Sequence, residues 1–137
     1  KHRIEDALEA VRAAQTNGVL PGGGTALLRA SSILNKDLFS WDNPDQSVSI
    51  DIMRSALQGP VRQMAENAGK SPDLVVSDLV SVEDWNLGWD FAKDEAVDMI
   101  ESGIIDPALV TCTALKNAVS VSSTLITTNF AIVEMSD

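Results

Sequence analysis

The feature that most constrains the fold is a glycine-rich stretch at residues 17–24, Asn-Gly-Val-Leu-Pro-Gly-Gly-Gly, which holds four of the chain's eight glycines. Amphipathic helical patterns precede and follow it, so the stretch is predicted to form a turn between two helices. Gly18 suits a left-handed helix cap, because glycine adopts positive φ without a steric penalty. The three glycines at 22–24 then expose bare backbone at the start of the next helix. Such a turn either admits a ligand or serves only as a tight connector.

Composition narrows the classes of function. The chain has 137 residues, enough for a single packed core, and a formal net charge of −10. That charge disfavours nucleic acid and anionic membranes as partners, since both need clustered Lys and Arg. Cys112 is the one cysteine, which excludes an internal disulfide and a cysteine-based metal site. No signal peptide opens the chain and no apolar run approaches the roughly 20 residues of a membrane span, so we expect a cytoplasmic protein without a membrane partner.

Hydrophobic periodicity predicts a mainly α fold, a helical bundle with short β-strands. Gly59 and Pro60 are predicted to separate two helices, and Asp106 with Pro107 is predicted to begin the longest one. The chain starts at Lys1, without methionine and inside a helical pattern, which indicates a fragment of a larger multi-domain protein. The predicted helices cover residues 4–17, 25–35, 47–58, 61–67, 72–80, 93–102 and 107–126, and the predicted extended segments cover 89–92 and 127–134.

Two aspartates have structural explanations as well as functional ones. Asp6 lies in the first predicted helix beside Glu5, where an acidic residue near the N-terminus interacts favourably with the helix dipole. Asp106 precedes the predicted start of the longest helix, where an aspartate side chain can cap the first free N–H groups. The residues alone leave these alternatives open, because a carboxylate has enough acceptor sites to serve a cap and a ligand together.

Several short motifs occur in an order that is typical of one family. They are Glu-Asp-Ala-Leu at 5–8, the triple glycine at 22–24, Asp-Met-Ile at 98–100, Gly-Ile-Ile-Asp-Pro at 103–107 and Ile-Thr-Thr at 126–128. In this order they resemble the C-terminal part of a group I (GroEL-type) chaperonin, and the resemblance covers essentially the whole chain. It implies that residues 1–17 belong to the intermediate-domain helix and residues 18–137 to the C-terminal half of the equatorial ATP-binding domain.

The resemblance also implies a site for ATP with Mg²⁺. Asp6 matches the family's catalytic aspartate, which a moving helix delivers to the bound ATP when the intermediate domain closes. A carboxylate in that position can accept a hydrogen bond from the attacking water and orient it. Asp106 matches the carboxylate that holds the ribose hydroxyls. The residues implied to contact the nucleotide are Gly22 and Gly23 through their backbone, Asp90, Phe91 and Ala92 beside the base, and Asp106.

Three departures from the family pattern bear on that site. Asp90, Phe91 and Ala92 stand where the family commonly has Asn-Ala-Ala, so a charge and a phenyl ring change the expected pocket wall. The preceding residues, 83–86, lack the glycines usual there. The family's phosphate and magnesium motif, Gly-Asp-Gly-Thr-Thr, does not occur in this sequence, so the magnesium ligands are expected in a missing N-terminal half. These features indicate a divergent member.

As a whole, the resemblance implies a subunit of an ATP-dependent folding chaperone. Its expected partners are the other subunits of a homo-oligomeric ring, unfolded client proteins and a co-chaperonin, although the sequence leaves the need for a co-chaperonin open. Residues 129–134 are expected to pair as a strand with a neighbouring subunit. Two alternatives stay open: a ring-forming scaffold that has lost nucleotide turnover, and a free-standing helical module whose glycine turn has no ligand.

Overall fold

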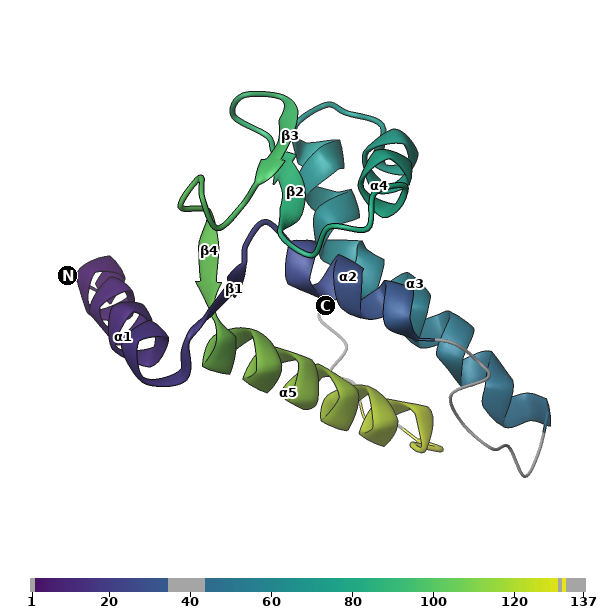
Figure 1. Cartoon of the computed structure of the whole chain (residues 1–137). Coiled ribbons are helices and arrows are strands. Elements are labelled where there is room, and N and C mark those ends of the chain that lie inside the picture. The colour runs from purple at the N-terminus through teal and green to yellow at the C-terminus, as the bar shows by residue number, and fades with distance from the viewer. Residues whose placement is uncertain (1, 35–43, 131, 133–137) are drawn as a thin grey trace, which may run out of the picture. The chain divides into compact units, whose positions relative to one another are not determined.

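The computed structural model describes residues 2–34, 44–130 and 132, which form helices and short strands (Figure 1). The elements in chain order are α1 (His2–Asn17), β1 (Val19–Pro21), α2 (Thr25–Ile33), α3 (Pro44–Asn67), α4 (Pro72–Val80), β2 (Leu87–Asp90), β3 (Glu95–Asp98), β4 (Ile105–Pro107) and α5 (Ala108–Ile126). In the described residues β1 pairs with β4 and β2 pairs with β3, each pair as a two-stranded sheet. A mainly α fold with short strands confirms the predicted fold class.

The chain divides into two compact units. One unit combines Lys1–Gly18 with Pro107–Asp137, and we call it the helix unit. The other unit spans Val19–Asp106, and we call it the core unit.

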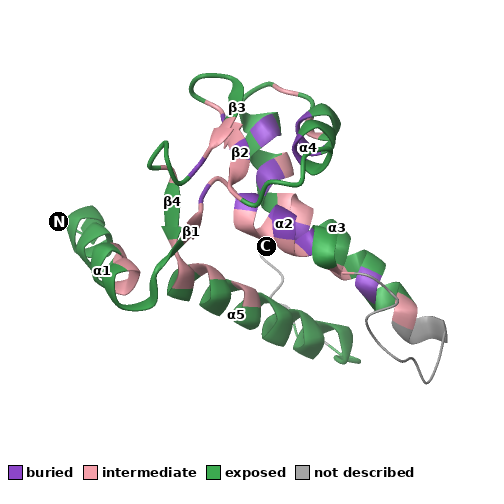
Figure 2. Cartoon of the chain, viewed as in Figure 1, coloured by how far each residue is buried: buried purple, intermediate pink, exposed green. Residues whose placement is uncertain are grey.

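The helix unit holds α1 and α5, which contact each other. The N–H of Ala108 donates to the carbonyl of Gly18 at 3.0 Å and ties the start of α5 to the end of α1. Gly18 has a left-handed φ of 82°, and its N–H donates to the carbonyl of Ala14 at 2.9 Å. The predicted glycine cap is therefore confirmed. Neither helix has a buried residue within the part of the chain that the structure describes (Figure 2).

Helix α5 corrects the expectation that nothing in the chain approaches a membrane span. Its 19 residues include one charged side chain, Lys116, and with a mean hydropathy of 1.3 they are long and apolar enough to cross a membrane. Polar residues, mostly Ser and Thr, divide the helix into short apolar runs, which hides how apolar it is on average. Such a composition is also typical of a helix that other parts of a protein cover.

The core unit packs α2, α3 and α4 against the hairpin of β2 and β3 (Figure 1). Trp89 and Phe91 pack against this core from the hairpin. Val61 and Ala65 lie one helical turn apart, so α3 presents both to the same interior. The buried cluster consists of Leu28, Val61, Ala65, Val75, Val76 and Leu79. Figure 2 shows the buried residues concentrated in these elements.

The predicted break at Gly59 and Pro60 is wrong, because α3 continues through both residues. A proline inside a helix costs about 3 kcal/mol, since it removes one hydrogen bond and crowds the preceding turn. Leu57 and Val61 are both buried, and burial of a large aliphatic side chain contributes about 1.5–3 kcal/mol. Packing on both sides of the proline therefore offsets its local cost and keeps the chain helical.

The prediction of a helix over residues 93–102 is also wrong. β3 occupies Glu95–Asp98 and pairs antiparallel with β2. The turn between the strands explains the difference: Oδ1 of Asp90 accepts a hydrogen bond from the N–H of Ala92 at 2.9 Å, and Asp94 has a left-handed φ of 62°. Aspartate tolerates both arrangements better than most residues, and both prevent a helix from forming here.

The predicted strand over 127–134 lies only partly within the described residues. Residues 127–130 follow α5 as a turn and irregular backbone. Ala131 and residues 133–137 lie outside the described part of the chain. The expected pairing of this segment with a neighbouring subunit therefore stays a prediction.

Candidate functional site

The glycine turn joins β1 to α2 and is held by its own backbone contacts. The N–H of Gly22 donates to the carbonyl of Ile104 at 2.9 Å. A Cβ at Gly22 would lie 2.9 Å from that carbonyl oxygen, and a Cβ at Gly24 would lie 2.9 Å from the backbone nitrogen of Val61. Neither neighbour is the end of a flexible side chain. The fold itself therefore requires glycine at both positions, independently of any ligand.

Gly23, the middle glycine, differs from its neighbours. Its φ of 63° favours glycine, but the nearest backbone atom to an added Cβ would be the carbonyl oxygen of Trp89, 3.8 Å away. The closer obstacle is Cε of Met99, at 2.8 Å, which is the far end of a flexible side chain. Gly23 is only half-buried. It is the glycine of the turn whose added Cβ would meet a side chain, that of Met99, before any backbone atom.

The N-terminus of α2 opens directly from this turn. The N–H of Thr25 donates to the carbonyl of Gly22 at 3.0 Å, and the N–H of Leu28 donates to that of Gly24 at 3.1 Å. The first turn of the helix therefore continues the glycine turn without a side-chain cap. The positive end of the helix dipole lies at the same place and favours a negatively charged group nearby.

Asp106 lies on β4, the strand that pairs with β1. It follows two residues after Ile104, whose carbonyl accepts the hydrogen bond from Gly22, so the glycine turn and Asp106 are held close along one pair of strands. The Asp106 side chain is exposed and has no hydrogen bond or ion pair among the described residues. The alternative role as a helix cap is wrong: Pro107 occupies the N-cap position of α5, without a side-chain cap bond. The carboxylate is available to a ligand.

The segment expected beside the base is the end of β2 and the turn after it. Asp90 is buried, and its Oδ1 accepts hydrogen bonds from the N–H groups of Ala92 and Lys93, at 2.9 and 3.3 Å. Phe91 packs against the hydrophobic core, whereas Ala92 is exposed. The side chains of Asp90 and Phe91 thus stabilise the fold in a way that the sequence did not indicate.

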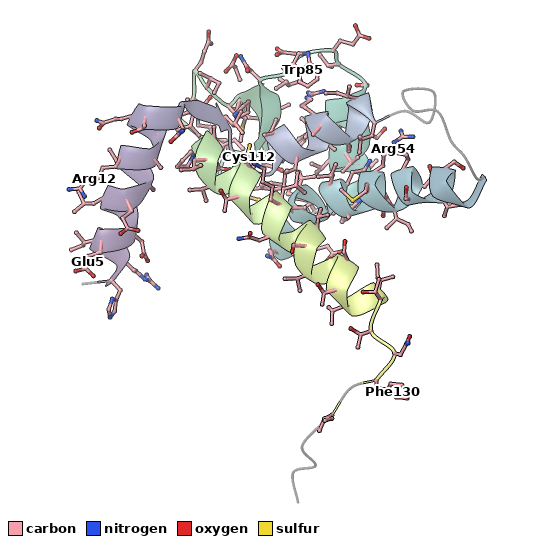
Figure 3. The ribbon with its side chains drawn as sticks, turned by 90° about the horizontal axis from the view of Figure 1, so that it is seen from below. Glu5, Arg12, Arg54, Trp85, Cys112 and Phe130 are labelled. Carbon is pink, nitrogen blue, oxygen red and sulfur yellow. The ribbon has the colours of Figure 1, made fainter. Side chains whose placement is uncertain are left out.

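Asp6 belongs to the helix unit and lies on the exposed surface of α1. Its carboxylate has no hydrogen bond or ion pair within the described ranges of the chain. Figure 3 shows the side chains of Glu5 and Arg12 extending from the same helix. The structure therefore brings the glycine turn together with the strands that carry Asp90 and Asp106, and places Asp6 in the separate unit.

An open groove of about 500 Å³ lies elsewhere in the core unit and contains none of the predicted site residues. In it, Arg29 donates to the carbonyls of Val82 and Leu87, both at 2.9 Å, and ties the loop before β2 to α2. Burial lowers the pKa of Arg29 below its usual value, and the charge of Asp84 opposes this shift. The lining residues are Arg29, Ser32, Ile33, Val80, Val82, Glu83, Asp84 and Trp85, the last of which is labelled in Figure 3.

The glycine turn and Asp106 offer a ligand bare backbone and a carboxylate, without a metal site among the described residues. Across residues 2–34, 44–130 and 132, no three His, Cys, Asp or Glu side chains gather closely enough to hold a metal ion. What the turn offers is bare backbone at a helix N-terminus and the exposed carboxylate of Asp106. Backbone N–H groups suit an anionic group, and a carboxylate suits hydroxyl donors such as those of a ribose.

Two residues that connect the site escaped the sequence-based prediction. Ile104 accepts the hydrogen bond from Gly22, and the side chain of Met99 lies against Gly23 of the turn. Met99 lies in the Asp-Met-Ile motif, which served only as a family marker. The sequence placed Met99 in a predicted helix over 93–102, where an apolar residue does not indicate such a contact. The contact depends on the hairpin that the structure has in place of that helix.

Comparison with known proteins identifies the class. The model of the TCP-1/cpn60 chaperonin family matches residues 1–136, so the chain belongs to this family. It is 47% identical over 134 residues to the protein named chaperonin GroEL in two strains of Orientia tsutsugamushi, Boryong and Ikeda. Each match covers 98% of this chain and 24% of the relative. The predicted resemblance to GroEL-type chaperonins is thereby confirmed.

A solved structure supports the same classification. The chain is similar to a group III chaperonin whose crystal structure was determined in the open state, with a TM-score of 0.78 and 37% sequence identity. The match covers 88% of this chain and 25% of that one. The chain therefore spans about a quarter of the length of the relatives it matches.

Proposed function

We propose that the chain is the C-terminal part of a subunit of an ATP-dependent, protein-folding chaperonin. In this proposal residues 1–17 belong to the intermediate domain and residues 18–137 to the equatorial, nucleotide-binding domain. The observation that carries the proposal is the hydrogen bond from Gly22 to Ile104, because it holds the glycine turn beside the strand of Asp106. Membership of the chaperonin family and the 47% identity to GroEL support it.

Each residue of the site has a separate task in this proposal. The backbone of Gly22 and Gly23 lies close to the nucleotide, and the phosphates are held by other parts of the full-length protein. The Asp106 carboxylate accepts hydrogen bonds from the ribose hydroxyls. Ala92 lies beside the base of the nucleotide. ATP supplies the phosphoryl group whose hydrolysis drives the conformational change, and the ligands of Mg²⁺ lie in other parts of the full-length protein.

Asp6 is the proposed catalytic residue. A carboxylate can accept a hydrogen bond from water and orient that water for attack on a phosphoryl group. Its free, exposed side chain on α1 is suited to this role, since no hydrogen bond or ion pair among the described residues holds it. A helix that brings the aspartate to the nucleotide only on closure makes hydrolysis wait for the conformational change.

The remaining expectations concern the assembled protein. We propose a cytoplasmic homo-oligomeric ring that acts on unfolded client proteins, and the need for a co-chaperonin stays open. In it, residues 129–134 pair with an adjacent subunit. The support is the family, whose matching relatives are named chaperonins.

One observation favours a second candidate, a ring-forming scaffold without nucleotide turnover. Asp90 uses its carboxylate in its own turn, and Phe91 packs into the core, at positions where the family commonly has Asn and Ala. The segment beside the base is therefore altered. ATP hydrolysis by the full-length protein separates the candidates, because a scaffold would form rings without it.

The catalytic assignment is tested by Asp6→Asn in the full-length protein, with Glu9→Gln as the control on the same exposed helix face. Loss of a water-orienting carboxylate is expected to slow ATP hydrolysis by about 10²–10⁴-fold and to leave ATP binding unchanged. Glu9→Gln should hydrolyse ATP at the wild-type rate. Wild-type turnover by Asp6→Asn would remove Asp6 from the mechanism.

A further inference from the structure

The side chain of Met99 fills the space between the glycine turn and strand β2. It is fully buried, with 0% of its surface exposed. A Cβ built at Gly88 of β2 would lie 2.5 Å from Cγ and 2.8 Å from Sδ of Met99. A Cβ built at Gly23 would lie 2.8 Å from Cε of the same side chain. The methionine therefore reaches from one glycine to the other, and both glycines leave room for it.

The backbone of Met99 joins the same segments through hydrogen bonds. Its N–H donates to the carbonyl of Asn86 at 2.9 Å, just before β2 begins. Its carbonyl accepts from the N–H of Ile104 at 2.8 Å, and the carbonyl of Ile104 accepts from the N–H of Gly22 at 2.9 Å. One residue thus connects the hairpin, the strand leading to Asp106 and the glycine turn.

We propose that Met99 is a positioning residue for nucleotide binding, an inference that rests on the proposed function. It is buried away from the nucleotide and acts through the turn, because its thioether sets the spacing between Gly23 and β2. An unbranched methionine suits this place, since it fits between two backbones where a branched side chain does not reach. The spacing determines whether the glycine turn, Asp106 and the segment after Asp90 meet one nucleotide together.

The test compares two volume-conserving exchanges in the full-length protein, Met99→Leu and Leu79→Met. Both residues are fully buried in the core unit, and such exchanges are normally well tolerated. Leucine ends one atom short of Cε and loses the contact with Gly23. Met99→Leu is expected to weaken the affinity for a non-hydrolysable ATP analogue about tenfold, a usual size for coupled contacts, and Leu79→Met less than twofold. Equal effects on affinity would overturn the proposal.

A double-mutant cycle measures whether Gly23 and Met99 affect analogue affinity through each other. A purely structural role of Met99 would not produce such coupling. Gly23→Ala places a methyl group against Cε of Met99, so its effect on analogue affinity is expected to be smaller in the Met99→Leu background than in the wild type. Additive effects would show that the two residues do not act through each other and would also overturn the proposal.

Hydrogen exchange distinguishes a failure of the proposal for Met99 from a failure of the proposed function. If the wild-type protein does not bind the analogue, the proposed function fails, whereas Met99 can still be tested without ligand. The N–H of Gly22 is then expected to exchange faster in Met99→Leu than in Leu79→Met. Should Met99→Leu not fold, the wild-type protein is measured with the analogue, which should slow exchange at Gly22 and Ile104 together. Unchanged hydrogen exchange at Ile104 would contradict the proposed connection between Met99, Ile104 and the glycine turn.

Discussion

At the scale of single residues, Gly22 is one of the two glycines of the turn whose added Cβ would meet fixed backbone. A Cβ there would lie 2.9 Å from the carbonyl oxygen of Ile104, which cannot move without breaking the pairing of β1 and β4. Gly59 is a matched control, because nothing lies within 4 Å of an added Cβ and the residue is helical.

We predict that Gly22→Ala lowers the free energy of unfolding of the full-length protein by about 1–3 kcal/mol through overpacking. Gly59→Ala should leave it unchanged or raise it by up to about 1 kcal/mol, because alanine is the better helix former. Urea denaturation followed by fluorescence measures both. Equal stability of the two variants would show that the contact with Ile104 is not tight.

The residues of the site could be predicted only in part. The glycine turn and Asp106 were found from local motifs, and the structure holds them side by side. The sequence did not indicate that Asp90 and Phe91 stabilise the fold, since their partners are a turn and a core that form only after the hairpin does. Met99 escaped for the same reason: its contacts lie on segments distant in the sequence.

At the scale of elements, local propensity predicted where most helices lie and failed where non-local packing decides. The glycine cap of α1 and the proline start of α4 follow from rules that act within a few residues. The hairpin of β2 and β3 depends instead on strand pairing, so a helix-like composition over 93–102 was misleading. The continuity of α3 depends on burial on both sides of Pro60.

We predict that Pro60→Ala stabilises the protein, because α3 continues through this position. Alanine restores an N–H that can donate to the carbonyl of Ala56 and removes the clash of the proline ring, and Pro60 itself is exposed. The free energy of unfolding should rise by about 1–3 kcal/mol in a chemical denaturation experiment. A loss of stability would mean that the proline bend is needed for packing between α3 and its neighbours.

At the scale of the whole molecule, the chain spans about a quarter of the length of its relatives, 24% of the GroEL proteins and 25% of the group III chaperonin. In the proposed function, the core unit forms one side of a nucleotide site, with backbone at the glycine turn and a free carboxylate at Asp106. The catalytic role of Asp6 is a separate part of that proposal. The phosphate and magnesium contacts are assigned to other parts of the full-length protein.

The most direct test of the proposed nucleotide site is the calorimetric titration of the full-length protein with a non-hydrolysable ATP analogue. We predict one site per subunit and an affinity at least about tenfold weaker in Asp106→Ala, because a ribose hydroxyl loses its charged acceptor. The control Asp78→Ala, at an exposed aspartate of α4, should bind like the wild type. Binding by Asp106→Ala with wild-type affinity would contradict the proposal that this carboxylate and the glycine turn form a nucleotide site.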